Sequence, residues 1–453
     1  MSSSWPASPP PVVESSELPL QPGPPRIKVL HVITAFAAGA GGNTLLSATG
    51  MDPDRYEVWI AGADGGPLWE RAERAGVRTV RLPRLRREVS PVDDLSVLFD
   101  LVTLIRRERF SIVHAHSAKG GFLGRLAAWL TGTPVIVYSL HGSDPWWPSR
   151  GSRRGSELGD LMSWPKRRLF LLMERALRPV TDGFIAVAPT VARDAIEVGL
   201  GRPGSVDVAP SAVDLDRIPY DRDPSVRAEL GIPERAPLVG SVGRLDAQKA
   251  PQDFVRMAAV VRRTHPDARF VMVGDGELAG AAANEASRLG VDILFTGFRS
   301  DAPRVASAVD VFVVSSLYEG VGRSVTEALA SGRPVVATCV DGVVDVVRPG
   351  ATGLLAPPRD PEALAACVSW MLDHADEARR MGQQGRKFVR SLFDPAVMCA
   401  AIERTYGRLL GLPRTDDDRP APGTHLEPRR KESRGDPRHG SLPARPPALS
   451  HHG

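Results

Sequence analysis

Short apolar segments alternate with longer amphipathic segments along most of this chain, beginning near residue 26. In the first half, apolar runs predict strands at Arg26–Thr34, Tyr56–Ala61, Arg78–Leu82, Ser111–His116, Pro134–Leu140, Ile185–Ala188 and Val206–Ala209. Between them, apolar residues at helical spacing predict helices such as Val92–Arg107 and Gly121–Thr131. After the first strand we expect a glycine loop, Ala37–Gly42, and then a helix from about Asn43. Alternating strands and helices are typical of a parallel sheet covered on both faces.

A second alternation follows the polar segment 216–237, which we interpret as a linker. Its predicted strands are Leu238–Val242, Arg269–Val273, Ile293–Thr296, Val309–Val314 and Pro334–Ala337. Its predicted helices are Pro251–Thr264, Glu277–Leu289, Arg304–Ala308, Ser324–Ala330, Pro361–Leu372 and a closing helix over 396–410. The pattern therefore predicts two doubly wound, Rossmann-like α/β domains, 26–215 and 238–395. In such folds the ligand binds at the carboxyl ends of the strands, which here face a cleft.

Composition limits the kinds of protein this chain can be. Its 453 residues are 42% hydrophobic, enough for two cores, whereas the ends, 1–25 and 411–453, are rich in Pro, Ser and Arg and are predicted to be disordered. The net charge of +4 gives no sign of nucleic-acid binding. Three widely spaced cysteines favour reduced thiols in a cytoplasmic protein. No signal peptide and no membrane-spanning segment is evident.

Two glutamates, Glu319 and Glu327, are the first candidates for chemistry. Glu319 follows a predicted buried strand, and Glu327 lies in the first turns of the next helix, away from its apolar stripe. The start of such a helix attracts anions, and two carboxylates suit a ligand with hydroxyl groups as well as phosphates. A nucleotide sugar is such a ligand. The alternative is one solvated loop carboxylate and one carboxylate at the positive end of a helix.

Two cations follow the first strand of the second domain. Arg244 and Lys249 stand five residues apart on the loop that leads into the next helix, so both can reach one diphosphate. The alternative is a pair of solvated surface cations. The alternative is less favoured, because the pair Glu319 and Glu327 is predicted at the same edge of the sheet.

A family resemblance rests on several segments taken together. GRLDAQKA, VMVGDGE, FTGFRSD, YEGVGRSVTEALASGRPVVAT and GATGLLAPPRDPEALA resemble the second domain of retaining glycosyltransferases of family 4, which have the GT-B fold. VHAHSAKGGFLGRLAAWLTGTPVIVYSLHG and APSAVDLDRI resemble the first domain. Together they cover most of residues 26–410, and the branch resembled builds capsule, exopolysaccharide or lipid-linked glycans.

The resemblance implies roles for residues of the second domain. Arg244 and Lys249 match the pair that holds the donor diphosphate, and Glu319 matches the glutamate that contacts the transferred sugar. Glu327 matches the glutamate that binds the nucleotide ribose, and backbone groups around Gly322 would add donors to the phosphates. Arg299 falls where relatives hold the base, largely through backbone groups.

The first domain is expected to supply the acceptor side. By the same resemblance, His141 lies close to the reacting sugar, and Gly41 and Gly42 belong to the glycine loop beside the donor phosphates. His114 and His116 are two residues apart on a strand and so share a face. Of the two, His116 is expected to line the acceptor side and His114 to be structural. Asn43 is a second acceptor-side candidate, although relatives usually have other residues after the two glycines.

The predicted function is a retaining transfer of sugar from a nucleoside diphosphate sugar, with UDP favoured by the resemblance. The acceptor would be a glycan or a lipid-linked intermediate. No metal and no cofactor is expected, since the cations and the helix start can stabilise the leaving diphosphate. Alternatives are a soluble transferase acting on a small metabolite, a nucleotide-sugar-binding protein without transfer activity, and an epimerase, which the family 4 spacing disfavours.

A membrane surface is a possible further partner. The segment Trp164–Pro179 has apolar residues at helical spacing (Leu169, Leu172, Met173, Ala176 and Leu177) and basic residues such as Lys166 and Arg168 on another face. One interpretation is an ordinary domain helix. The other is a surface that rests on anionic lipid, which would make the protein peripheral on the inner face of the plasma membrane.

Overall fold

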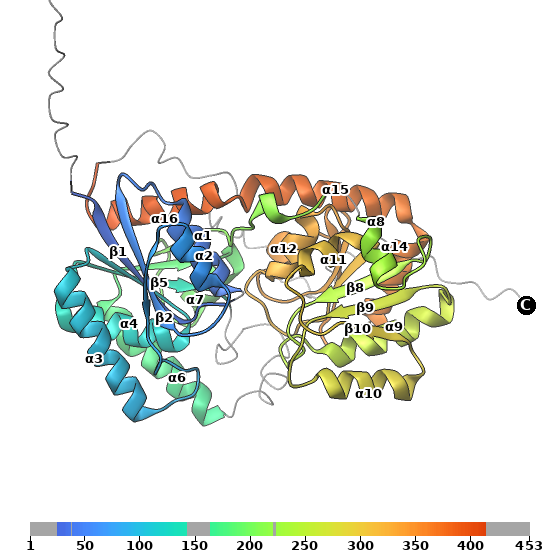
Figure 1. The fold of residues 1–453 in the computed structure, drawn as a ribbon, viewed down its shortest axis with the longest axis horizontal. Helices are drawn as coiled ribbons and strands as arrows, with labels where there is room; N and C mark the ends of the chain where they lie inside the picture. The colour runs from blue at the N-terminus through green and yellow to red at the C-terminus, as the bar shows by residue number, and fades with distance from the viewer. Residues whose placement is uncertain (1–24, 38, 143–163, 221–222, 414–453) are drawn as a thin grey trace, which may run out of the picture.

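Two parallel sheets, each with helices on both faces, form the two halves of the molecule in Figure 1. The computed structural model describes residues 25–37, 39–142, 164–220 and 223–413. The predicted terminal segments 1–25 and 411–453 therefore lie almost wholly outside the described residues. The architecture confirms the predicted GT-B arrangement of two Rossmann-like domains.

The first sheet has the strand order β3-β2-β1-β4-β5-β6-β7. Its strands are β1 (Ile27–Ala35), β2 (Tyr56–Ala63), β3 (Arg78–Arg81), β4 (Ile112–His116), β5 (Val135–Leu140), β6 (Gly183–Ala186) and β7 (Val206–Val208). Its helices are α1 (Ala40–Gly50), α2 (Leu68–Arg74), α3 (Pro91–Glu108), α4 (Ala118–Thr131), α6 (Trp164–Leu177) and α7 (Pro189–Glu197). The order reverses between β1 and β4, which creates a crevice at their carboxyl ends.

The second sheet has the order β10-β9-β8-β11-β12-β13 and reverses between β8 and β11. Its strands are β8 (Leu238–Val242), β9 (Arg269–Val273), β10 (Ile293–Phe295), β11 (Val311–Val314), β12 (Val335–Thr338) and β13 (Gly353–Ala356). Its helices are α8 (Pro224–Glu229), α9 (Pro251–Thr264), α10 (Ala279–Leu289), α11 (Ala302–Ala308), α12 (Arg323–Ala330), α13 (Val343–Val346), α14 (Pro361–Asp373) and α15 (Ala375–Leu392). Both crevices open toward the junction of the two halves.

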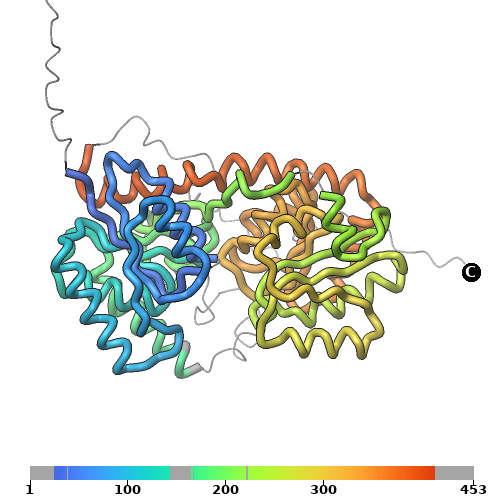
Figure 2. Tube along the Cα trace, in the orientation of Figure 1, coloured from blue at the N-terminus to red at the C-terminus, as the bar shows by residue number. Residues whose placement is uncertain are grey.

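The last helix, α16 (Pro395–Leu409), packs on the first domain although it follows the second in sequence. The trace in Figure 2 shows the orange-to-red end of the chain, α15 followed by α16, running from the second half to the first. Its residues Met398, Ile402 and Tyr406 are buried against β1, β4 and β5 of the first sheet. The closing helix predicted over 396–410 is confirmed, and it joins the two domains by burying apolar surface.

The sequence pattern did not predict β13, α13 or α15, and three further details differ from the predicted elements. The helix after β1 begins at Ala40, so Gly41 and Gly42 lie in its first turn and not in a loop. The predicted linker 216–237 contains α8, which packs on α11 and buries Arg227 beside Asp310 at 2.7 Å. The third difference is the face that α6 buries.

The predicted apolar stripe of α6 is largely on its exposed side. Leu169 is 56% exposed and Leu172 is 55% exposed, whereas Glu174 and Leu177 are buried. The carboxylate of Glu174 pairs with the fully buried guanidinium of Arg125 on α4. This ion pair sets the rotation of the helix, because breaking it would leave a buried charge without a partner. Helical periodicity does not reveal such a pair.

Candidate active site between the two domains

Glu319 lies in the loop between β11 and α12 and is only 5% exposed. One of its carboxylate oxygens accepts a hydrogen bond from Ser316 Oγ at 2.7 Å and pairs with the ammonium group of Lys249. Its backbone N–H donates to Asp341 Oδ2 at 2.8 Å. The carboxylate is therefore held in one position at the carboxyl end of the second sheet, as a group that orients a substrate must be.

Lys249 reaches Glu319 from the loop between β8 and α9, and a pocket opens beside it. The pocket lies at the carboxyl ends of β8 and β11, and its lining includes Ser241, Gly243, Arg244, Lys249, Ser316 and Ser324. Cations, hydroxyl groups and the start of a helix thus surround one space. Such a lining suits an anionic ligand.

Arg244 stands at the rim of this pocket with 56% of its side chain exposed. Its guanidinium forms an ion pair with Asp246 at 2.7 Å and donates a hydrogen bond to Gln248 at 2.8 Å. Gln248 in turn donates to the backbone oxygen of Tyr318, next to Glu319. The arginine predicted to hold a diphosphate is therefore beside Lys249, on a loop tied to the Glu319 loop.

The helix α12 starts at the pocket with Gly322 as the residue before it. Gly322 has a φ of +78°, which glycine adopts without strain, and no side chain caps the first turn. The N–H groups of Val325 and Thr326 donate to the Gly322 oxygen. Those of Arg323 and Ser324 have no partner among the described residues and are available to an anion. Glu327 accepts a hydrogen bond from Arg323 Nε at 2.8 Å, one turn earlier on the same helix. Both glutamates thus belong to one end of the second sheet, as predicted.

The first domain meets this loop through His141 and Gly142, which directly follow β5. A Cβ on Gly320 would lie 2.0 Å from the backbone oxygen of His141, and one on Gly142 would lie 3.0 Å from Gly320. On the other side of the loop, a Cβ on Gly342 would lie 1.7 Å from the Gly320 oxygen. Three backbone segments are thus stacked in contact, and the contact brings His141 beside Glu319 across the domain junction.

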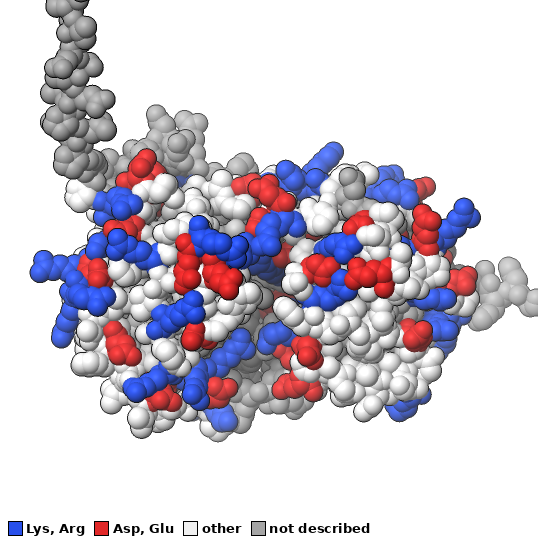
Figure 3. Space-filling model, viewed as in Figure 1, with Lys and Arg blue, Asp and Glu red and all other residues white. Residues whose placement is uncertain are grey.

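Gly42 also faces the second domain, whereas Gly41 packs within the first. Gly42 is buried, and a Cβ there would lie 1.6 Å from Nη1 of Arg323, the partner of Glu327. Gly41 lies against the backbone of Phe36, where a Cβ would be 3.1 Å from the carbonyl carbon. Because both side chains are absent, α1 approaches β1 closely on one side and the start of α12 on the other. Figure 3 shows a hollow at the junction with Lys or Arg side chains at its rim.

Two acceptor-side predictions disagree with the structure. His116 is 2% exposed, and both of its ring nitrogens bond to other histidines, so it does not line the cleft. Asn43 is 9% exposed, and its Oδ1 accepts from the backbone N–H of Ala212 at 2.9 Å. Asn43 therefore fastens α1 to the segment after β7. Sequence spacing gave the correct strand and helix for both residues but not their burial.

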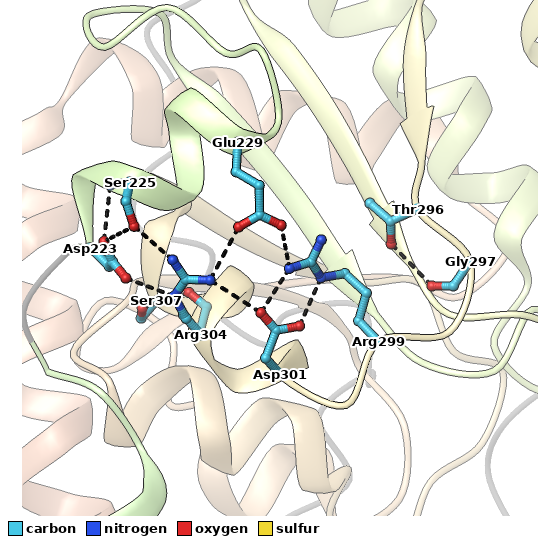
Figure 4. Close-up of polar contacts among 9 residues, drawn as sticks. All are labelled: Asp223, Ser225, Glu229, Thr296, Gly297, Arg299, Asp301, Arg304 and Ser307. Carbon is cyan, nitrogen blue, oxygen red and sulfur yellow. Dashed lines mark hydrogen bonds and ion pairs between the residues drawn. The ribbon is translucent and has the colours of Figure 1, made fainter.

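Arg299 is not among the residues that line the pocket, and Figure 4 shows its side chain held by acidic residues. It donates to both carboxylate oxygens of Asp301, at 2.8 and 2.7 Å, and to Glu229 of α8 at 2.7 Å. Arg304 joins the same group through Glu229 at 3.2 Å and Asp301 at 3.3 Å, and it also pairs with Asp223 at 2.7 Å. This network fixes α8 to the loop after β10. A contact between Arg299 and a bound base would therefore come from its backbone.

Three residues of the site were missed by sequence reasoning. Asp341 orients the Glu319 loop, Arg323 links Glu327 to Gly42, and His31 lies behind His116. Arg323 could have been found, since it stands four residues before Glu327 on the predicted helix. Asp341 and His31 gave no signal, because their partners are distant in sequence.

Within the described part of the chain, none of the helices combines the length and hydropathy needed to cross a bilayer.

Comparison with known proteins places both domains in described families. Residues 223–388 match the family described as glycosyl transferases group 1, and residues 38–212 match the glycosyl transferase 4-like domain. A 2-deoxystreptamine glucosyltransferase of Streptomyces kanamyceticus is 30% identical over 79% of this chain and 95% of its own length. An Escherichia coli UDP-Gal:α-D-GlcNAc-diphosphoundecaprenol α-1,3-galactosyltransferase is 28% identical over 70% of this chain and 80% of its own.

The fold also matches solved structures. The Anabaena protein HepE, crystallised with UDP and glucose, superposes with a TM-score of 0.70 at 21% identity. The match covers 84% of this chain and all of HepE. At that identity the comparison concerns the fold, and it agrees with the two-domain architecture described above.

Proposed function

Because this chain belongs to the family 4 glycosyltransferases of GT-B fold, we propose that it uses a UDP-sugar and transfers the sugar with retention to a lipid-linked acceptor. The family and the fold predicted from the sequence motifs are confirmed, and so is the glycosyltransferase activity class. The donor, the acceptor and the stereochemistry are the proposed parts.

One observation carries the donor proposal: the pocket at the carboxyl ends of β8 and β11 joins Arg244, Lys249 and the start of α12 around one space. In the proposed reaction these groups stabilise the diphosphate as its bond to the sugar breaks. Glu319, held by Lys249 and Ser316, is placed to orient the sugar, and Glu327 to bind the ribose. The acceptor hydroxyl attacks from the side of the leaving phosphate, whose oxygen takes the proton.

Calorimetric titration with UDP, GDP and ADP tests the donor. Selective binding of UDP, reduced at least about tenfold in Arg244→Ala, is expected, since a charge-assisted bond to phosphate is lost. Arg256→Ala is the matched control, because Arg256 is similarly exposed (51%) but pairs with Glu285 on the α9–α10 surface. Equal affinity for the three nucleotides would contradict the assignment of UDP as the donor nucleotide. An equal loss of UDP affinity in Arg244→Ala and Arg256→Ala would contradict the assignment of Arg244 to the diphosphate.

Exposed apolar residues support the lipid-linked acceptor. On α3, Val92, Leu95 and Phe99 lie at helical spacing and are 81%, 68% and 70% exposed. The neighbouring helices α4 and α6 add Trp129, at 55%, and Leu172. Basic residues flank this surface, including Arg86 and Arg87 before α3 and Lys166 and Arg168 on α6. An apolar surface with a basic margin suits an anionic bilayer.

Flotation with vesicles tests this surface. The full chain is expected to float with vesicles containing anionic lipid and to float less with neutral ones. The double variant Leu95→Asp with Phe99→Asp should lose flotation and keep UDP binding, whereas Leu289→Asp, on exposed α10 of the other domain, should float as wild type.

A small polyol acceptor is the second candidate, favoured by the name of the Streptomyces relative. Transfer to a soluble aminocyclitol at full rate without vesicles, and flotation indifferent to lipid charge, would establish that candidate. Proton NMR of the glycoside formed reports whether the anomeric configuration of the donor is retained.

A further inference from the structure

Behind His141 lie three histidines that the proposed reaction does not use. His31 is on β1, and His114 and His116 are on β4, next to it in the sheet. His31 and His114 are fully buried, and His116 is 2% exposed. His141 follows β5, the next strand along. Parallel register therefore places a row of imidazoles on one face of the sheet, leading from the core to the domain junction.

Hydrogen bonds connect three of these rings end to end. Nδ1 of His31 lies 2.8 Å from Nε2 of His116, and Nδ1 of His116 lies 2.9 Å from Nε2 of His141. The rings of His31 and His116 are stacked, with centroids 5.0 Å apart. His114 is outside this chain of bonds, because its nitrogens bond to Tyr406 Oη at 2.7 Å and Ser139 Oγ at 2.8 Å.

The cluster is better suited to this hydrogen-bonded chain than to a metal ion. Nitrogens of His31, His114 and His116 lie within 4.8 Å of one another, which is close enough for three ligands. However, both nitrogens of His114 and both of His116 already have hydrogen-bond partners. A metal would have to break several of these bonds inside a buried site.

The rings are neutral at physiological pH. Burial lowers the pKa of His31 to about 3 and that of His141 to about 4, and it lowers the pKa of His116 well below its ordinary value. A neutral imidazole has one N–H and one lone pair. Each bond in the chain therefore needs one donor and one acceptor, and all the donors must point the same way.

The inner end of the hydrogen-bonded row of imidazoles, at His31, determines which way the N–H donors point. Nε2 of His31 is buried and has no hydrogen-bond partner among the described residues. If the donors pointed inward, this nitrogen would carry an N–H without an acceptor, which is rare in proteins. If they point outward, it carries only a lone pair. The penalty for a buried unsatisfied donor favours the outward direction at least about fivefold.

We propose that His31 and His116 are positioning residues that hold His141 as the tautomer protonated on Nδ1, so that it presents an N–H donor to the cleft. His31 donates to His116, His116 donates to Nε2 of His141, and Nδ1 of His141 keeps the proton. His141 then donates to a hydroxyl or phosphate oxygen of the sugar donor and does not act as a base. This role rests on the placement of His141 at the transfer site.

Nitrogen NMR of the full chain, labelled with ¹⁵N-histidine, tests the tautomer without any turnover. Two-bond ¹⁵N–¹H correlations distinguish the tautomers, and the signals lost in His141→Asn identify the residue. Protonation of His141 on Nδ1 in the wild type is the expected result. Protonation on Nε2 would overturn the proposal, whichever sugar the enzyme transfers. The measurement needs no substrate, so its result does not depend on whether the proposed donor and acceptor are correct.

Kinetics test whether His31 acts through its donor or through packing. His31→Phe keeps a ring in the stack but removes the donor, so kcat should fall about fivefold with an unchanged KM for the sugar donor. His31→Asn packs less well but can place an N–H near the Nδ1 position, and it should recover most of the loss. Tyr406→Phe removes a neighbouring buried bond outside the chain and should leave kcat unchanged. The proposal fails if kcat of His31→Asn is no higher than kcat of His31→Phe, or if Tyr406→Phe lowers kcat as much as His31→Phe does.

Discussion

The contact between Gly320 and the first domain yields a prediction that can be worked out from distances. In Gly320→Ala the new Cβ would lie 2.0 Å from the backbone oxygen of His141 and 2.9 Å from its carbonyl carbon. Real Cβ atoms essentially never approach within 3.0 Å, so the loops must separate by about 1 Å. Gly320 does not have a positive φ, and alanine can therefore adopt its backbone conformation. The whole effect comes from the contact between domains.

The expected magnitudes differ for stability and for turnover. Overpacking of this kind costs about 1–3 kcal/mol of folding free energy. A displacement of about 1 Å between His141 and Glu319 is expected to lower kcat about 100-fold, because transfer depends on alignment of the groups. Nucleotide affinity should change much less, since Arg244 and Lys249 both belong to the second domain.

The assay is release of nucleoside diphosphate in the presence of donor and acceptor, with nucleotide binding measured in parallel. Gly142→Ala provides an intermediate case, because its Cβ would lie 3.0 Å from Gly320. Gly280→Ala is the control: no atom lies within 4 Å of its Cβ, and alanine stabilises a helix by about 1 kcal/mol relative to glycine. Turnover by Gly320→Ala within threefold of wild type, or a larger loss in Gly142→Ala, would refute the reasoning.

Three further results are expected. Lys249→Ala should abolish turnover and lower the unfolding free energy by about 1–3 kcal/mol, because the carboxylate of Glu319, which is 5% exposed, loses its cation. Urea unfolding of the double variant that also carries Glu319→Gln checks this cause, since stability should recover once the buried charge is removed. Glu327→Ala should lower kcat/KM for the donor about tenfold or more. The unfolding free energy should change by less than about 0.5 kcal/mol, since the substitution removes only a partly exposed ion pair with Arg323. A loss of unfolding free energy large enough to account for the lost activity would indicate a structural role instead. His31 has a folded pKa of about 3 against 6.5 when unfolded, so only the unfolded state takes up this proton between those values. The contribution of His31 to the unfolding free energy is therefore full well above pH 6.5 and falls by roughly 1 kcal/mol from pH 7.5 to 5.5, and His31→Phe should flatten the measured pH dependence by that amount.

Five of the six strands of the second sheet could be predicted to within two residues at each end, whereas β13 was not predicted. The strands Leu238–Val242 and Arg269–Val273 begin and end where the apolar runs do. Their side chains are buried on both faces, so a continuous apolar run is sufficient to identify them. The positions of Arg244, Lys249 and Glu319 at one edge followed from the same pattern, because parallel strands all end on the same side.

Helix starts at glycines were less predictable. Gly41 and Gly42 are poor helix formers and favour a loop in any local estimate, yet they lie in the first turn of α1. The helix requires them because Arg323 and the backbone of Phe36 occupy the space that side chains would fill. Both contacts come from tertiary packing.

The histidines show the same division between sequence and structure. Alternation along a strand places His114 and His116 on one face, and the structure confirms it. The surroundings of His114 depend on α16, which arrives from the far end of the chain and brings Tyr406 to His114. No local pattern contains that information.

The sequence by itself determined the two α/β domains, the family, and the strand ends at which the charged residues gather, since these depend on hydrophobic period and motif spacing. Only the tertiary structure decided which side chains face the cleft, because burial and pairing depend on neighbours distant in sequence. Asn43 became a structural group in this way, His116 became a buried link between His31 and His141, and Asp341, Arg323 and His31 became parts of the site. The close glycine contacts at 142, 320 and 342 then set how His141 of one domain meets Glu319 of the other.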